Sequence, residues 1–374
     1  MTLVKENRTP TSVLWQRYGP SVLVFGIATG FVLISLASHH WDPMAFVRLG
    51  TRYGQGDPNG TIGYDGQFAY QIALAPLNAA PYLDIPPYRY QRILYPFVAG
   101  LVGFRQPSLV PWMLIGLNII ALTIGTYVMG GILAQNRLSR WYALTVGIFA
   151  GQLVSLRLDV NEPFALMFAL LAVYVFENKR YRLGAVFLAL SILSKETSIA
   201  FVGGYLLYYF IKREWRTLIE TALISLGPFI ILQLAIWNAF GQVGLRSGGQ
   251  GATSFSLIPF GGMLAFGFDS FEKFVVVLLI LGPLVLIPCI ALIIYLLRYF
   301  LERNISAMAI VLALHIIIMV TLPFSTYVDL PGVLRLTSGL VVSTVAFGAV
   351  SQSRKLLNYS TLWIASVVFL RFFI

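Results

Sequence analysis

The sequence has few charged residues and a single cysteine. Only 11 % of its 374 residues are charged, whereas a soluble domain is nearer a quarter charged. The one cysteine, Cys289, excludes an internal disulfide. No Walker-type phosphate loop and no Gly-x-Ser-x-Gly motif occur. These absences argue against a soluble protein, a disulfide-bonded domain and a P-loop enzyme.

Apolar residues dominate what is present. They make up 58 % of the chain, in runs that approach or exceed the length needed to cross a bilayer. We therefore expect an all-α polytopic membrane protein with about 11 transmembrane helices. The expected spans are residues 21–38, 109–134, 141–156, 163–176, 183–194, 197–211, 217–238, 274–299, 304–323, 336–350 and 357–371.

Two further apolar runs, 93–104 and 257–268, are too short to cross and predict half-helices at the membrane surface. Residues 1–18 are polar and basic, and no cleavage site follows, so we interpret 21–38 as a retained first span.

The charges predict the orientation. The net charge of +11 would suggest nucleic acid for a soluble protein, but here cytoplasmic loops explain it and we expect no nucleic-acid partner. With the N-terminus in the cytoplasm, fifteen Lys/Arg and five Asp/Glu lie inside, against eleven and ten outside. This distribution follows the positive-inside rule. It also places two thirds of the acidic residues on the outer side.

The first long polar segment, 39–92, lies on that outer side and holds Asp42, Asp57, Asp65 and Asp84. Within it, Asp65 stands in Gly63-Tyr64-Asp65-Gly66-Gln67, before a short amphipathic helix that Pro76 stops. Two interpretations are open: Asp65 is a catalytic base at the membrane surface, or it caps the helix that follows.

Two more outer motifs carry acidic residues. In Asp159-Val160-Asn161-Glu162-Pro163, Asp159 and Glu162 would share a helix face, although Asp159 or Asn161 would also serve as an N-cap. Lys195-Glu196 lies between two short spans and is either part of a site or a local ion pair that closes a hairpin.

Four arginines on the outer side, Arg89, Arg92, Arg246 and Arg335, suit phosphate oxygens, because a guanidinium group donates two hydrogen bonds at once. Lipid headgroups would attract them equally. His39-His40 and His315 lack spaced partners, so no metal site is predicted at the histidines.

The order of these motifs resembles the GT-C superfamily of membrane glycosyltransferases. Tyr64-Asp65-Gly66-Gln67 matches its first-loop catalytic aspartate, and Asp159-Val160-Asn161-Glu162 resembles the second-loop acidic motif of the oligosaccharyltransferase catalytic subunit. Leu193-Ser194-Lys195-Glu196-Thr197 is similar to a lysine motif in related mannosyltransferases. Together with Arg92-Ile93-Leu94-Tyr95-Pro96, the first motif also resembles bacterial membrane proteins of this superfamily.

The resemblance implies a GT-C-like bundle with a catalytic module in residues 1–215, including an outer loop over 39–108 with short amphipathic helices. Residues 216–374 would be variable C-terminal helices. It implies transfer of a sugar, with inversion, from a polyprenyl-phosphate donor to a lipid or glycan acceptor, at the outer face of a bacterial plasma membrane. Asp65 would be the base. The implied substrate-binding residues are Tyr64, Gln67, Arg89, Arg92, Asp159, Asn161, Glu162, Lys195, Glu196, Arg246 and Arg335.

Asp159 and Glu162 would orient the sugar or acceptor, or hold a divalent cation such as Mg²⁺ or Mn²⁺, which prefers carboxylate oxygens. Tyrosines of the loop would stack on sugars or form an ordinary interfacial belt. The chain lacks a large C-terminal outer domain and a second acidic residue beside Asp65. The alternative functions are a transporter or flippase of an anionic lipid or solute, and a non-catalytic subunit of a glycan-assembly complex.

Overall fold

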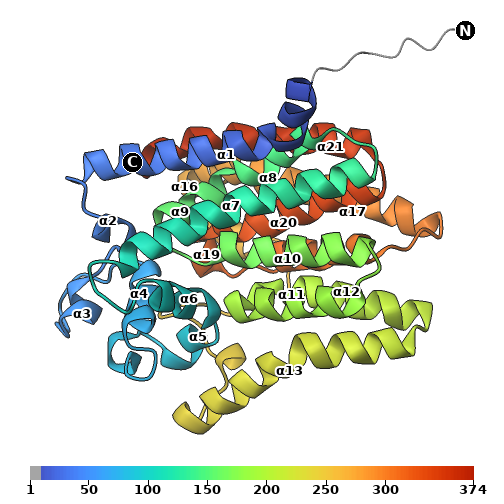
Figure 1. The fold of residues 1–374 in the computed structure, drawn as a ribbon. Helices are drawn as coiled ribbons and strands as arrows, with labels where there is room; N and C mark the ends of the chain where they lie inside the picture. Colours follow the sequence, from blue (N-terminus) through green and yellow to red (C-terminus); the bar gives the residue numbers. More distant parts are fainter. Residues whose placement is uncertain (1–9) are drawn as a thin grey trace, which may run out of the picture.

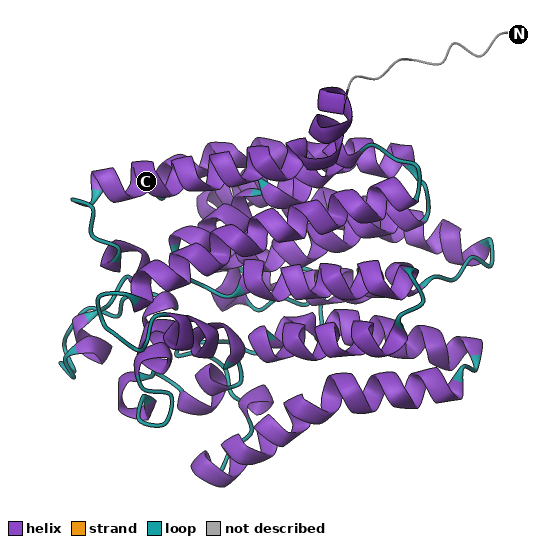
Figure 2. Cartoon of the chain, viewed as in Figure 1, coloured by secondary structure: helices purple, strands orange, loops and turns teal. Residues whose placement is uncertain are grey.

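A computed structural model describes residues 10–374, and within that range the fold is all-helical, with no β-strand (Figures 1 and 2). A single antiparallel bridge joins Leu49 and Gly63 in the described part of the chain. Long helices lie side by side in a bundle, and a lobe of short helices covers one end of it. The predicted fold class is confirmed at this level.

Five helices are long and apolar enough to cross a membrane. They lie within α1 (Pro10–Ser38), α7 (Val110–Gln135), α13 (Trp215–Phe240), the continuous helix Phe271–Leu301 and α20 (Leu330–Val350). The fourth consists of α16 (Phe271–Leu281), a π-helical segment η5 (Gly282–Leu286) and α17 (Ile287–Leu301). All five correspond to predicted spans.

Shorter helices fill the spaces between these five. They are α10 (Glu162–Glu177), α11 (Tyr181–Ser194), α12 (Ile199–Lys212) and α18 (Ala307–Val320). Each matches a predicted span, but none has the length of the five long helices. Eleven crossings therefore stay a prediction.

Three predicted stretches differ in the structure. Residues 141–156 form no single span but η2 (Arg140–Ala143), α8 (Leu144–Gly147) and α9 (Ala150–Arg157). The break follows Gly147, where a Cβ would lie 2.3 Å from Thr126 Oγ1 of α7, and Phe149 then takes an extended ψ of 134°. Close packing on α7 thus overrides the continuous apolar pattern.

The other two stretches, 257–268 and 357–371, form less regular helices than predicted. Residues 257–268 give only one-turn helices, α14 (Gly261–Leu264) and α15 (Phe266–Asp269). At the C-terminus, α21 (Arg354–Ser360) continues as a 3₁₀-helix, η6 (Thr361–Phe372). A 3₁₀-helix rises about 2 Å per residue, so its twelve residues extend roughly 24 Å.

The predicted outer loop is a folded lobe. It contains α2 (Met44–Val47), α3 (Thr51–Gly54), α4 (Gly66–Leu74), η1 (Ala80–Tyr82), α5 (Pro86–Tyr90) and α6 (Leu94–Val102). One apolar cluster joins Tyr70, Ala73 and Tyr95 of the lobe to Leu114 of α7 and Phe164 of α10. The lobe therefore packs on the bundle through a core of its own.

Helix α4 positions the candidate site. Its predicted start at residue 67 and its stop before Pro76 agree with the observed Gly66–Leu74. Phe68 and Ile72 pack in a cluster with Ile236 of α13, while Tyr70 and Ala73 face α6 and α7. Because both sides of the short helix are buried, its first residues are held firmly at the end of the bundle.

The N-terminus of α4 also touches the turn before α10. A Cβ on Gly66 would lie 2.3 Å from the carbonyl oxygen of Leu158, closer than any real Cβ contact. We expect Gly66→Ala to lower the free energy of unfolding by about 1–3 kcal/mol, the usual cost of overpacking. Denaturant unfolding in detergent measures it. Gly30→Ala in α1, where a Cβ meets nothing within 4 Å, is the control, and an equal effect of both variants would contradict this close approach.

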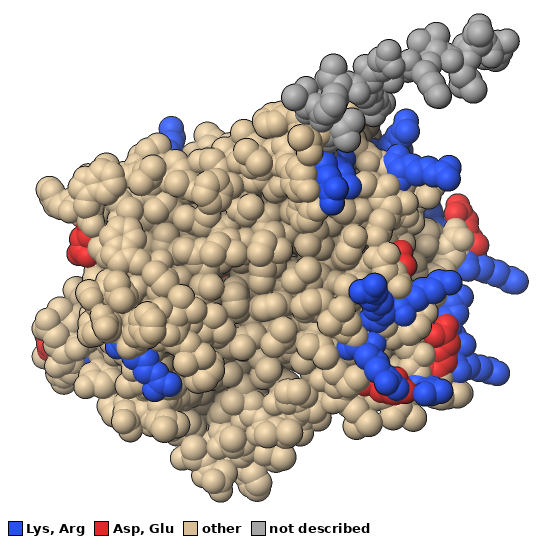
Figure 3. Space-filling view, in the orientation of Figure 1, with Lys and Arg blue, Asp and Glu red and all other residues tan. Residues whose placement is uncertain are grey.

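Charged side chains are unevenly distributed over the surface. In the face shown in Figure 3, most Lys and Arg side chains lie at the end of the bundle away from the lobe. The broad middle is nearly free of charged atoms. Such an apolar band between two polar ends is expected of a protein whose helices cross a bilayer.

Candidate functional site

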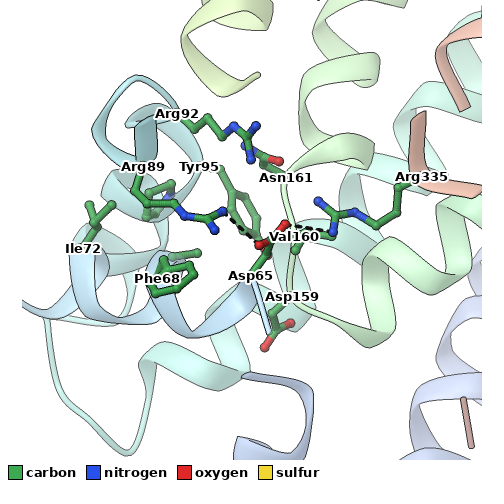
Figure 4. A pocket seen from close by; sticks show the side chains of 12 residues that line it. Asp65, Phe68, Ile72, Arg89, Arg92, Tyr95, Asp159, Val160, Asn161 and Arg335 are labelled. Atoms are coloured by element: carbon green, nitrogen blue, oxygen red, sulfur yellow. Dashed lines mark hydrogen bonds and ion pairs between the residues drawn. The ribbon is translucent and has the colours of Figure 1, made fainter. Parts of the chain in front are cut away.

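The lobe and the bundle meet at a buried ionic cluster around Asp65. One Asp65 oxygen accepts a hydrogen bond from Arg89 Nη1 at 2.9 Å, and the other accepts from Arg335 Nη1 at 3.0 Å. Figure 4 shows the carboxylate between the two guanidinium groups. Arg89 belongs to α5 and Arg335 to α20, so segments 270 residues apart converge on this one side chain.

Asp65 is not a helix cap. It occupies the N-cap position of α4 with φ −56° and ψ −30°, and its side chain makes no capping hydrogen bond. A capping side chain accepts from a backbone N–H of the first turn, whereas both Asp65 oxygens are taken by arginines. The structure therefore rejects the capping interpretation.

Four more ion pairs extend the cluster. Arg89 donates from Nε and Nη2 to Asp84, each at 2.7 Å. Glu162 Oε1 accepts from Lys195 at 2.6 Å and from Arg335 Nε at 2.8 Å.

The fourth pair joins Arg92 to Glu196, with distances of 2.7 and 2.6 Å. Of the two interpretations left open for Lys195-Glu196, the local ion pair is wrong, because each residue has a distant partner. In total, four cations (Arg89, Arg92, Lys195, Arg335) meet four carboxylates (Asp65, Asp84, Glu162, Glu196).

The arginines of the cluster do not extend toward lipid headgroups. Arg89 and Arg92 are each 8 % exposed and Arg335 is 5 % exposed. The Arg89 guanidinium lies 4.1 Å from the ring centre of Phe68, and that of Arg92 lies 4.3 Å from the ring centre of Tyr88. Since Tyr88 also accepts a hydrogen bond from Arg92, it supports the arginine.

The cluster shifts the pKa values of its acids. Burial acts to raise the pKa of Asp65, but Arg89 and Arg335 outweigh it and hold the pKa well below its usual range. At Glu162, burial again acts to raise the pKa, but the charges of Arg335 and Lys195 outweigh it and lower the pKa to about 2. Both carboxylates are therefore ionised at neutral pH.

Asp159 is the exception. It is fully buried, takes a left-handed φ of 48°, and neither side-chain oxygen has a hydrogen-bond partner among the described residues. Burial raises the pKa of Asp159 well above its usual value, against a weaker opposing effect of Arg157. A buried acid without a partner favours its neutral form.

We expect Asp159→Asn to raise the free energy of unfolding at pH 7 by about 1–3 kcal/mol. Asn is neutral without a proton, whereas the buried acid loses about 1.4 kcal/mol of stability for each unit by which its folded pKa exceeds the unfolded value. Asn also tolerates the left-handed backbone. In the wild type, the folded state keeps a proton that the unfolded state loses above about pH 4, so stability falls as pH rises from there toward the raised folded pKa. Melting curves from pH 4 to 8 measure this. The stability gained by Asp159→Asn over the wild type should grow with pH, and a gain that stays constant would contradict this explanation. An equal gain in the control Asp57→Asn, on the exposed lobe surface, would also contradict it.

A small cavity adjoins the cluster. It has a volume of about 30 Å³, room for one or two water molecules. Its polar lining consists of Asp65, Arg89, Arg92, Tyr95, Asp159, Asn161 and Arg335. Charged residues from the lobe, the α9–α10 turn and α20 thus surround one space (Figure 4).

The other predicted residues are placed differently. Gln67 is fully buried and supports the lobe, because its amide accepts from Gly50 N and donates to the carbonyl of Ile62. Arg246, in η4 (Gly244–Arg246), has an exposed side chain that does not line the cavity. The substrate-binding predictions for Gln67 and Arg246 receive no support from these positions.

Tyr64 and Asn161 do lie at the cluster. The Tyr64 hydroxyl accepts from Arg335 at 3.1 Å and donates to Asp329 at 2.8 Å. Asn161 takes the N-cap position of α10, makes no capping hydrogen bond, and donates from its side chain to the carbonyl of Ser194. It therefore holds the hairpin tip that carries Lys195 against the cavity wall.

Three residues of the site were not predicted. Asp84 fixes Arg89, Asp329 fixes Tyr64, and Tyr95 lines the cavity with its hydroxyl on the carbonyl of Leu114 at 2.9 Å. Asp84 precedes Arg89 by five residues across two prolines, a spacing that indicates no particular contact. Only the acidic character of the outer segments pointed to Asp84 and Asp329.

Of the two roles left open for Asp159 and Glu162, the structure does not favour holding a divalent cation. Within the part of the chain that the structure describes, no group of three or more His, Cys, Asp or Glu side chains is arranged to hold a metal. Glu162 Oε1 is already shared by Lys195 and Arg335, and their positive charges disfavour a cation beside it.

Comparison with known proteins identifies no relative of this chain. No family model, no curated protein and no solved structure matches it.

Proposed function

We propose that this chain is a GT-C type glycosyltransferase that moves a sugar from a polyprenyl-phosphate donor to a lipid or glycan hydroxyl. The supporting observation is Asp65, a carboxylate on the wall of a cavity, held between Arg89 and Arg335. A base for proton transfer and cations for a phosphate are the two kinds of group that such a reaction needs.

The reaction assigns a role to each group. The acceptor oxygen forms a bond to the anomeric carbon as the bond from that carbon to the phosphate oxygen breaks. The electron pair leaves with the phosphate, and Asp65 takes the acceptor proton. Inversion follows because attack and departure occur on opposite faces of the sugar. Arg89, Arg92, Lys195 and Arg335 stabilise the departing phosphate.

The low pKa of Asp65 makes it a weak base while both arginines hold it. The cluster pairs four cations with four carboxylates, so a phosphate must compete with Asp65 for Arg89 and Arg335. When those arginines turn to the phosphate, Asp65 loses its counter-ions and its pKa rises. Donor binding thereby converts Asp65 from an ion-pair partner into a proton acceptor.

The charge distribution supports an orientation. We place the Lys- and Arg-rich end of the bundle in the cytoplasm. The site and the lobe then face outward in a bacterial plasma membrane, with the N-terminus inside. A polyprenyl chain would stay in the bilayer while its phosphate reaches the cavity at the water boundary.

The test uses the purified full-length protein in detergent with a panel of radiolabelled polyprenyl-phosphate sugars and simple acceptors. We expect at least one donor to be consumed, with polyprenyl phosphate released in equal amount. A transporter would instead move a labelled lipid across vesicles without cleaving it. Transport with every donor intact would replace this proposal by the transporter alternative.

A further inference from the structure

A second and much larger cavity lies on the other side of α20. It is bounded by the Phe271–Leu301 helix, α20 and the C-terminal segment α21–η6, and its volume is about 1080 Å³. That volume is at the upper end for ligand sites. Most of its lining is apolar, including Leu284, Ile287, Leu292, Leu362 and Phe369.

The apolar part of this cavity offers few free hydrogen-bonding groups to a polar ligand. Trp363 is 5 % exposed, and its indole N–H donates to the carbonyl of Leu284 at 2.9 Å, within the π-helical segment. The Leu284 carbonyl lies in an irregular helical turn, and Trp363 supplies its hydrogen-bond donor. The buried hydroxyls of the wall, on Thr344, Ser360 and Ser366, likewise donate to backbone carbonyls, and an apolar space with such a wall suits hydrocarbon.

The charged residues of the cavity gather at one end. Arg298 and Lys355 have exposed side chains there, and neither side chain forms an ion pair or hydrogen bond with another described residue. The acidic residue of the lining is Glu302, which accepts from Asn304 at 3.4 Å. The three charges leave this end with a net positive charge of one.

This end lies opposite the Asp65 cluster. Arg335 stands near the start of α20, while Thr344 of the cavity follows it by nine residues, about 13 Å along a helix. Lys355 comes after the far end of α20, beside the end of α17. The cationic mouth is therefore on the Lys- and Arg-rich side of the protein.

From this arrangement we propose that the cavity is a binding site for an anionic phospholipid of the inner leaflet. Its acyl chains occupy the apolar space and its phosphate lies between Arg298 and Lys355. Basic pockets between membrane helices on the cytoplasmic side suit such headgroups. This site is separate from the Asp65 cluster and does not rest on the glycosyltransferase proposal.

The test is native mass spectrometry of the full-length protein in detergent, with equimolar phosphatidylglycerol and phosphatidylcholine of identical acyl chains. We expect the wild type to retain phosphatidylglycerol. Arg298→Gln with Lys355→Gln should lower this preference roughly thirtyfold, since each cation near a headgroup contributes about a factor of five. Glu302→Gln should raise it about fivefold by the same reasoning.

A matched control removes two charges at the same end but outside the cavity lining, by Arg303→Asn with Arg354→Gln. Equal losses in the two double variants would overturn the proposal, because they would show attraction to the whole surface. Ala291→Phe fills the apolar space without changing charge, and unchanged lipid retention in it would also overturn the site. Preferential retention of polyprenyl phosphate over phosphatidylglycerol that the Arg298→Gln/Lys355→Gln variant loses would overturn the choice of occupant, because it would place that lipid in this cavity and not at the Asp65 cluster.

Discussion

Asp65→Asn should lower the rate of sugar transfer by roughly 10²–10⁴-fold, the usual contribution of a positioned base. The fold should persist, because each arginine keeps a second carboxylate. Arg89 still has Asp84, and Arg335 still has Glu162. Turnover with saturating donor and acceptor, alongside a thermal melt in the same detergent, measures both effects.

The same substitution should strengthen donor binding. Asn cannot compete with the phosphate as an ion, so we expect the dissociation constant of the donor to fall about tenfold, less than a full charge-assisted hydrogen bond contributes. A residue that only supports the structure would not combine slower transfer with tighter binding. Equilibrium binding of a labelled donor tests this sign.

Asp84→Asn is the matched control. It removes the same charge from the same arginine, but Asp84 does not line the cavity. We expect its transfer rate to stay within about tenfold of the wild type, the effect of a weakened charged contact. Wild-type turnover in Asp65→Asn would remove Asp65 from the mechanism. Equal losses in both variants would show that Asp65 acts only by placing Arg89.

Arg335→Met should lower the free energy of unfolding by about 3–5 kcal/mol, the cost of removing one partner from a buried ion pair. Arg335 is 5 % exposed and serves Asp65, Glu162 and Tyr64 at once. Without it, one buried negative charge stays unmatched. Arg182→Met is the control, since Arg182 pairs with Glu220 but its side chain is 71 % exposed, and exposed pairs contribute about 1 kcal/mol or less.

This loss should depend on pH with a defined sign. Glu162 has a folded pKa of about 2, below its unfolded value near 4.3. Its ion pairs therefore stabilise the protein fully above about pH 4 and lose their effect as pH falls toward 2. The difference between wild type and Arg335→Met should narrow over that range. A pH-independent difference, or a Glu162→Gln/Arg335→Met double variant with strictly additive losses, would contradict the coupling.

The long apolar helices could be predicted from the sequence, and the ionic partners could not. Runs such as 109–134 and 217–238 lie within two residues of α7 and α13, because helix length follows directly from apolar length. Pairing in the cluster depends on the tertiary fold, which brings Arg92 to Glu196 across 104 residues and Arg335 to Glu162 across 173. Adjacent Lys195 and Glu196 suggested the wrong pair for this reason.

Local patterns also failed where backbones approach closely. Residues 141–156 have the composition of a span, but the contact of Gly147 with α7 breaks the helix. Asp65 has the sequence context of a cap, yet two arginines far along the chain compete for its oxygens. The candidate acids could be identified from their predicted position on the outer side. The role of each acid could be assigned only after the structure showed its ionic partners.

The late position of Arg335 has a consequence for biosynthesis. All four carboxylates of the cluster and three of its cations lie before residue 200, whereas the fourth cation follows more than 130 residues later. Chains are made from the N-terminus, and early segments begin to fold first. A nascent chain that ends before α20 therefore carries Asp65 and Glu162 with one counter-ion too few. The ionic cluster is complete only after Arg335 in α20 has been synthesised. A released fragment of residues 1–215 would therefore lack a complete site.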